Sequence, residues 1–352
     1  MATKLATRFL EESEYPAWND LVAKAEEGSI YATPEYLDVL SGETGGRFRI
    51  LVADRGGEIA GGIALYERTS SWGRYATSRL LLYYHGIVLA PHRSKYPSER
   101  TARTIETLTA LEQALSALGW GRLQIKSRAP LSDMRVFFDR GWVAEPSYTY
   151  VAPIGDLDAL WQRMEQNLRR LVTRCTRDGV EFTEDDDFEN FYRLHEQTHV
   201  RKGASLYLPE ARFRRYFERL RSSNLCRLFQ ARMPDGRVAS TQLVLLGRHP
   251  VCHTVSAAAD PDLQKTGATA FLRWKTFQWL SERGFKANDL TDAQLNSVTH
   301  FKSQLGGELE LVLVLSRPDR GRFRIQNWIH NSGSAIKRTL RSVVAGRQRE
   351  GR

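Results

Sequence analysis

The alternation of apolar and polar residues divides the first half of the chain into short strands and helices. Two strand-like runs, Arg47 to Asp54 and Glu58 to Glu67, are joined by Arg55-Gly56-Gly57, and glycines tolerate the positive φ of a tight hairpin turn. The rest of the pattern predicts further helices and strands. They are helix 14–25, strand 80–89, helix 98–118, strand 122–126, helix 131–140 and strand 142–151. This order predicts a mixed sheet with helices packed on its faces.

The second half begins with helical periodicity and then repeats the strand and helix order of the first half. Two or three helices are predicted over 157–178, 188–200 and 209–222, followed by strands 225–233, 238–246 and 251–256. The last four elements are helix 268–282, strand 287–290, helix 295–304 and strand 309–315. These four have the same order as the last four elements of the first half.

Glycines placed after corresponding helices support an internal duplication. Gly119 and Gly284 are separated by 165 residues, and so are Gly141 and Gly306. A glycine just past a helix supplies the left-handed conformation that ends it, so the equal spacing indicates two copies of one unit. We therefore predict a first domain over 1–150, a second over 151–316 and a tail over 317–352.

Composition narrows the class of protein. A length of 352 residues is typical of two domains, and 41% hydrophobic with 26% charged residues is typical of a globular chain with enough apolar side chain for two cores. The cysteines Cys175, Cys226 and Cys252 fit neither a disulfide framework nor a zinc pattern, which favours a reducing compartment. No signal-like or membrane-length apolar stretch occurs. We expect a cytoplasmic protein, with peripheral contact at the inner membrane face left open.

The positive charge is concentrated in the tail. The formal net charge is +10, and residues 317–352 hold ten basic against two acidic side chains, a net +8. Ile336, Leu340 and Val344 alternate there with Lys337 and Arg341. Such a segment could lie on an anionic membrane surface, bind tRNA phosphates, or be a solvated tail with no partner. We expect no DNA partner.

A glycine-containing loop leads directly into the helix predicted from residue 268. Backbone N–H groups and the helix dipole at such a place can hold a pyrophosphate or the end phosphate of a tRNA. The alternative is a plain helix entry in which Gly267 relieves strain. The cofactor-binding residues predicted here are Gln264, Lys265, Thr266, Gly267, Ala268 and Thr269.

Four spaced motifs in the second half carry a family resemblance. They are Asn167-Leu168-Arg169-Arg170 to Gly179-Val180, Phe191-x2-Leu194-x3-Thr198-x2-Arg201-x-Gly203, Gly284-x4-Asp289-Leu290 and Phe301-Lys302-x3-Gly306-Gly307. Over roughly residues 150 to 316 the chain resembles the FemABX-type transferases and related GNAT-like acyltransferases of envelope polysaccharide and peptidoglycan systems. The first half resembles the degenerate partner domain of that family.

The resemblance implies an α/β protein with tandem GNAT-like domains that transfers an acyl or aminoacyl group onto an amine. It implies that Lys302 holds a phosphate or carboxylate of the acceptor, with Arg201 as a second anchor and Tyr207 as a further substrate-binding residue. The loop around Gly267 resembles the Gln/Arg-x2-Gly-x-Gly/Ala loop of coenzyme A-binding GNAT proteins. The donor would be acyl-CoA or aminoacyl-tRNA, used as a co-substrate without a permanently bound cofactor.

Amide formation requires a group that takes a proton from the acceptor ammonium and donors that polarise the carbonyl. Asp289 and Asp292, at and just after a strand end, and His253 are the candidates, with Asp289 and His253 as our predicted catalytic residues. Asp289 could equally cap a turn, and His253 could be a satisfied core histidine.

A His-Glu-x2-His sequence is present at residues 195–199, on a predicted helix. This is the zinc metalloprotease signature. Phe191, Leu194 and Thr198 fall at packing positions of the same helix, and no further zincin signature follows, so we predict no metal. The chain also lacks a Gly-x-Ser-x-Gly elbow and a full phosphate-loop signature, which disfavours covalent serine catalysis and NTP hydrolysis.

We therefore predict an N-acyltransferase that moves an acyl group from acyl-CoA to an amino group of a cell-envelope precursor. One alternative is a FemABX-type, aminoacyl-tRNA-dependent transferase acting on a peptidoglycan precursor. A second alternative, from another class, is a non-catalytic protein that binds an anionic glycan or lipid precursor. A zinc hydrolase is the third.

Overall fold

The computed structural model describes residues 5–326 apart from residues 80, 93, 130, 132, 202, 204 and 205. The membrane or tRNA contact predicted for the tail falls largely on 327–352, which lie outside the described residues. Of the helices in the described part of the chain, none combines the length and apolar character that a membrane crossing requires.

The elements follow the predicted order closely. In the first half they are β1 (Ala6–Phe9), α1 (Tyr15–Lys24), α2 (Pro34–Thr44), β2 (Arg47–Arg55), β3 (Glu58–Ser70), β4 (Gly73–Ala76), β5 (Ile87–Leu89), α3 (Pro97–Ala117), β6 (Arg122–Lys126), α4 (Arg135–Asp139) and β7 (Val143–Ala152). In the second half they are α5 (Leu157–Arg163), α6 (Gln166–Arg177), β8 (Glu181–Glu184), α7 (Phe188–Arg201), α8 (Glu210–Ser222), β9 (Cys226–Arg232), β10 (Val238–Leu245), β11 (Val251–Ala259), α9 (Ala268–Glu282), β12 (Ala287–Asp289), α10 (Ser297–Gln304) and β13 (Glu308–Ser316).

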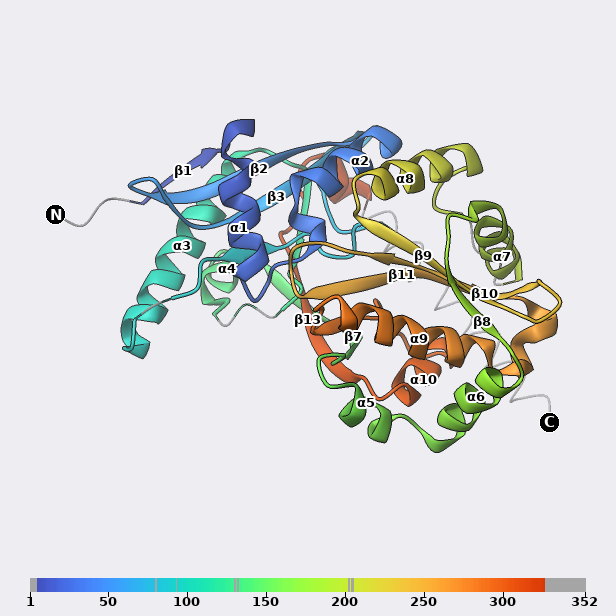
Figure 1. Ribbon diagram of the computed structural model, residues 1–352. Helices are drawn as coiled ribbons and strands as arrows, with labels where there is room; N and C mark the ends of the chain where they lie inside the picture. Colours follow the sequence, from blue (N-terminus) through green and yellow to red (C-terminus); the bar gives the residue numbers. More distant parts are fainter. Residues whose placement is uncertain are drawn as a thin grey trace, which may run out of the picture.

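One mixed sheet runs through both halves (Figure 1). Its strand order is β1-β2-β3-β4-β6-β13-β7-β12-β11-β10-β9-β8, with β5 paired to β3. In the second half, α7 and α8 lie on one side of β8–β11, whereas α6 and α9 lie on the other (Figure 1). The predicted mixed sheet flanked by helices is confirmed.

The two halves exchange their last strands. β7, the last strand of the first half, pairs with β12, and β13, the last strand of the second half, pairs with β6. The register shows the duplication, because Val151 faces Asp289 and Ser316 faces Gln124, two pairs related by the 165-residue offset. The domain boundary expected at residues 150 and 151 falls within β7, and the division into domains stays a prediction.

Apolar packing also joins the halves. The described residues form three large apolar clusters, where the sequence predicted two cores. One lies under α3 in the first half and one between the sheet, α6 and α9 in the second. The third combines Trp18 and Tyr36 of the first half with Phe213, Leu228 and Val255 of the second. This shared cluster fixes one half against the other.

The glycines that were expected to end helices have the predicted backbone conformation. All four helix-ending glycines, Gly119, Gly141, Gly284 and Gly306, have positive φ, between 72° and 85°. The strand predicted over 80–89 is wrong except for β5, because Leu81 has a φ of 67°. Before β5 the described residues of the segment make only isolated bridges, Arg79 with Leu82 and His85 with Lys126.

Two further differences from the prediction concern single helices and strands and leave the overall fold unchanged. The helical stretch 157–178 breaks into α5 and α6, since Met164 adopts an extended conformation at the end of α5. The elements β1, α2, β4 and β8 were not predicted. None of these differences changes the order of the main strands.

The duplicated glycines provide a matched test of packing. Both Gly141 and Gly306 have positive φ, but a Cβ at Gly141 would meet nothing within 4 Å, whereas one at Gly306 would lie 3.1 Å from Leu160 and Met164 atoms. We expect G141A to cost roughly 1 kcal/mol of unfolding free energy from backbone strain alone. We expect G306A to cost at least about 2 kcal/mol because overpacking adds to that strain.

Urea denaturation of the two variants measures this difference. Equal losses of unfolding free energy would contradict the close approach of Gly306 to the α5 backbone.

Candidate active site in the opening between two parallel strands

Two neighbouring parallel strands separate at the centre of the second half. β11 and β12 pair at Val251–Ala287, Cys252–Asn288 and His253–Asp289, after which β12 ends and β11 continues to Ala259. The chain turns away after Asp289 through Thr291 and Asp292, whose φ values are 50° and 55°. The strands therefore leave a V-shaped opening at their carboxyl ends, where open α/β sheets bind ligands.

A cleft of about 210 Å³ occupies this opening. Its walls come from both strand edges, from α7, α9 and α10, and from the first half through Tyr83. The lining includes Tyr83, His195, Thr198, His199, Tyr207, Thr254, Val255, Ser256, Ala257, Arg273, Leu290, Thr291, Asp292, Val298, Thr299 and Lys302. The cleft thus depends on segments far apart in the sequence.

β11 carries an irregularity where it borders the cleft. Leu243 of β10 faces Ser256, and the next residue, Val244, faces Thr254, so Val255 is an extra residue on β11. A β-bulge of this kind turns backbone and side chains away from the regular ladder and is frequent beside active sites. Among the described residues, β11 has no ladder partner on the cleft side after His253, and its Thr254 carbonyl accepts a hydrogen bond from Thr291 Oγ1 at 2.9 Å.

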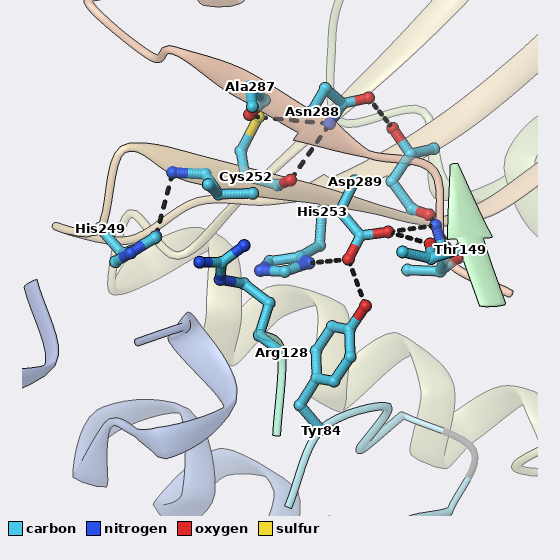
Figure 2. A network of polar contacts seen from close by, with 12 residues as sticks. Tyr84, Arg128, Thr149, His249, Cys252, His253, Ala287, Asn288 and Asp289 are labelled. Carbon is cyan, nitrogen blue, oxygen red and sulfur yellow. Dashed lines mark hydrogen bonds and ion pairs between the residues drawn. The ribbon is translucent and has the colours of Figure 1, made fainter. Parts of the chain in front are cut away.

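The point where the strands separate is held by the buried carboxylate of Asp289 (Figure 2). Tyr84 Oη donates to Asp289 Oδ2 at 2.5 Å, while Thr149 Oγ1 and the Thr291 backbone N–H donate to Oδ1 at 2.5 and 2.7 Å. His253 Nδ1 lies 3.4 Å from Oδ2, an ion-pair separation. Burial acts to raise the Asp289 pKa, but the contacts with His253, Thr149 and Tyr84 outweigh it and lower the pKa to about 2. Asp289 is therefore an ionised carboxylate whose two oxygens both accept hydrogen bonds.

The two predicted catalytic residues lie behind the cleft rather than in its lining. His253 and Asp289 are fully buried, and the His253 ring packs against Tyr31 and Tyr84 of the first half, with centroids 5.1 and 5.7 Å away. The turn-capping alternative for Asp289 fits this arrangement, because the Thr291 N–H donates to its side chain. His253 is a core histidine, but neither of its ring nitrogens makes a hydrogen bond to a described residue, so the alternative of a satisfied histidine is not met. A direct catalytic role for either residue stays a prediction.

Two of the three predicted substrate-binding residues line the cleft. The Lys302 ammonium, on α10, donates to the backbone carbonyls of Thr291 and Asp292, and so holds the turn that follows β12. Tyr207 also lines the cleft, with its ring 5.3 Å from that of His195. Burial, and secondarily Asp292, raises the pKa of Tyr207.

Arg201 and the predicted cofactor loop lie outside this lining. Arg201 contacts the Gln264 side chain, whose amide oxygen accepts at 2.7 Å when oriented towards the guanidinium. Gly267 has a φ of 91° and begins α9, and a Cβ there would lie 2.8 Å from Leu171. Both the helix entry and the phosphate interpretations fit this geometry, so the cofactor role of residues 264–269 stays a prediction.

Sequence reasoning missed that the histidine pair on α7 borders the cleft. A spacing of four residues places His195 and His199 on one helix face, and this face borders the cleft. His195 Nδ1 lies 2.9 Å from Ser256 Oγ, and His199 Nδ1 lies 2.9 Å from the His195 carbonyl oxygen. Within the described residues, no group of three or more His, Cys, Asp or Glu could hold a metal ion. The four-residue spacing that matches a zinc signature was therefore the feature of the sequence that could have located this face of the cleft.

Comparison with known proteins places the fold. FemX matches with a TM-score of 0.69 at 13% identity, over 87% of this chain and 96% of that one. The C-terminal domain of a putative lysylphosphatidylglycerol synthetase from Agrobacterium fabrum matches at 0.56 and 12%, over 89% and 95%. A tandem GNAT protein from the clavulanic acid biosynthesis pathway matches at 0.51 and 14%, over 89% and 98%. A comparison with curated protein sequences gave no match.

At these identities the structural likeness establishes the fold, and the predicted tandem GNAT-like architecture is confirmed. Residues 162–303 match the family model of the acetyltransferase (GNAT) domain. This match covers α7, β11, α9 and nearly all of α10, the elements that surround the cleft. Residues 162–303 are therefore similar to a GNAT acetyltransferase domain, within a chain that has a tandem GNAT-like fold.

Proposed function

We propose that this protein is an N-acyltransferase that transfers an acyl group from acyl-CoA to an amino group of a cell-envelope precursor. The observation that carries the proposal is the cleft between the separated edges of β11 and β12, bordered by a β-bulge and a histidine pair. An extended amide-containing arm can pair with a free strand edge. A thioester at the bulge would then meet backbone donors that polarise its carbonyl.

The histidine pair supplies a group that can take the proton of the acceptor. The His195 carbonyl oxygen can only accept, so the hydrogen of the neutral His199 ring lies on Nδ1 and its Nε2 keeps the lone pair. Nε2 accepts a proton from the acceptor ammonium, and the free amine attacks the thioester carbon. The new C–N bond forms, the C–S bond breaks, and the thiolate leaves as a thiol with the proton that the attacking nitrogen loses on becoming an amide.

The surroundings of the loop at Gly267 suit a phosphorylated donor. Arg174 of α6 donates to the carbonyl oxygens of Lys265 and Thr266, at 3.1 and 2.6 Å, and so fixes the entry to α9. The backbone N–H groups at the start of α9 would bind the diphosphate of coenzyme A. We propose an envelope acceptor because one structural neighbour is described as a putative lysylphosphatidylglycerol synthetase.

One observation favours aminoacyl-tRNA as a second candidate donor. A groove of about 400 Å³ along α6 is lined by Trp161, Arg169, Arg170, Arg174 and Arg177. Arginines beside a half-buried aromatic ring suit a phosphate backbone and a stacked base. The same reaction would then break an ester bond in place of the thioester.

Donor binding separates the two candidates. A ligand that binds only the folded protein raises its melting temperature, so we expect acyl-CoA to raise the Tm and aminoacyl-tRNA at equal concentration to leave it unchanged. Stabilisation by aminoacyl-tRNA alone would assign the protein to the second candidate. No stabilisation by either donor would contradict both.

Replacement of His199 tests the proton-accepting step. We expect H199Q to lower kcat by roughly 10²- to 10⁴-fold, the usual contribution of a general base. The matched control is E196Q on the same helix, where Glu196 is exposed and outside the cleft lining. A steady-state assay of thiol release measures both variants. An unchanged kcat in H199Q would remove this residue from the mechanism.

The ionised Asp289 should make stability depend on pH. Its folded pKa of about 2 lies below the ordinary value of about 4, so its contribution is present above pH 4 and is lost as the pH falls towards 2. We expect D289N to cost on the order of 2 kcal/mol at pH 7 and less at pH 3. The control is D38N, at an exposed salt bridge to Arg219.

Urea denaturation at the two pH values gives the comparison. A D289N loss that stays constant from pH 7 to pH 3 would show that the carboxylate is not ionised in the folded protein.

A further inference from the structure

A buried arginine with no partner among the described residues borders the cleft. Arg273, on α9, has only 6% of its surface exposed and lines the opening between β11 and β12. No hydrogen bond or ion pair joins its guanidinium to another described residue, and Nη1 is a buried donor with no acceptor in the described part of the chain. A buried charge of this kind is unfavourable unless something compensates it.

A second deeply buried arginine is compensated in part. Arg317 is 5% exposed and donates from Nη2 to the backbone carbonyl of Trp120, while its Nε and Nη1 have no partner among the described residues. Burial and Arg320 lower the pKa of Arg317, and Glu112 and Asp319 act to raise it. For Arg273, burial lowers the pKa to about 10, and no carboxylate counteracts that effect. Arg273 therefore keeps its charge at neutral pH with no counter-ion in the part of the chain that the structure describes.

The rest of the cleft is also short of negative charge. Among the described residues that line it, Asp292 is the one carboxylate, while Arg273 and Lys302 are both cationic. The Lys302 ammonium is directed at two backbone carbonyls. With two cationic side chains and one carboxylate, the described lining has a net positive charge, which one anion beside Arg273 would balance.

We propose that Arg273 binds a compact oxyanion, a carboxylate or a phosphate, carried by the substrate that occupies the cleft. A guanidinium presents two parallel N–H groups to either anion and binds it in a bidentate manner. The inference rests on the proposed function in so far as the cleft is the reaction site. It adds that the acyl group or the acceptor carries a negative charge close to the reacting atoms.

This anion is distinct from the diphosphate expected at the loop. Gly267 and Arg273 are six residues apart along α9, which corresponds to roughly 9 Å at 1.5 Å per residue. One phosphate group cannot span both places. Arg273 therefore selects a second charged group, and an uncharged acyl chain with an uncharged acceptor would leave the guanidinium unpaired.

The test compares R273M with R317M, because methionine keeps much of the side-chain length and removes the charge. Thermal denaturation is recorded in a low-salt, anion-poor buffer and with increasing acetate, succinate, inorganic phosphate or methyl phosphate. We expect R273M to melt higher than the wild type in the anion-poor buffer, because an uncompensated buried charge is gone. We expect R317M to melt lower, because a bonded arginine is lost.

The added anions give the second readout. One of the two anion classes should raise the wild-type and R317M melting temperatures in a saturable manner, with at least a tenfold weaker effect on R273M. Stabilisation by the carboxylates identifies a carboxylate-bearing substrate, and stabilisation by the phosphates a phosphorylated one. An equal rise in R273M, or no saturable rise in the wild type, would overturn the proposal.

Acyl-CoA binding and turnover, measured on the same three proteins, separate this inference from the proposed function. Anion binding that depends on Arg273 in a protein without acyltransferase activity would leave the anion site standing and reject the acyltransferase. Turnover by the wild type with unchanged anion binding in R273M would reject the anion site alone.

Discussion

The separation of β11 from β12 depends on one buried carboxylate. Asp289 is the last residue of β12, and it accepts hydrogen bonds from β7 through Thr149, from the first half through Tyr84 and from the following turn through Thr291. These contacts hold the strands together up to Asp289 and direct the chain away immediately after it. The cleft exists because the pairing stops there.

Strand exchange explains why the first half is needed although the cleft lies mainly in the second. β7 belongs to the first half by sequence but carries Thr149 into the second, and Tyr83 and Tyr84 complete the site from the same half. At the 165-residue offset, Gln124 stands in place of Asp289, Leu108 in place of Arg273 and Phe137 in place of Lys302. The first half thus supports a site whose charged residues it does not repeat.

The sequence alone was enough to predict the features that depend on local backbone chemistry. The periodicity located most strands and helices, and the glycine spacing located the duplication because a left-handed residue after a helix strongly favours glycine. Tyr207 and Lys302 were expected at the site and do border the cleft.

The remaining features depend on contacts between distant segments. The exchange of β7 and β13 leaves no local trace, and the buried path of Leu81 to Gly86 has the composition of a strand. Arg273 lies among the buried residues Phe271, Leu272 and Trp274, so its position on the helix does not indicate that it borders a cleft. His195 and His199 were noted for their spacing, but only the fold shows that they face Ser256 and Tyr207.

The central claim is that the opening between β11 and β12 receives the acyl donor, and a crystal structure with a non-hydrolysable acyl-CoA analogue tests it most directly. The account predicts the acyl arm between residues 254–257 and the turn at Thr291, with its carbonyl oxygen at the bulge and the diphosphate at Gly267. An analogue bound elsewhere on the protein, with no part of it between β11 and β12, would contradict the account.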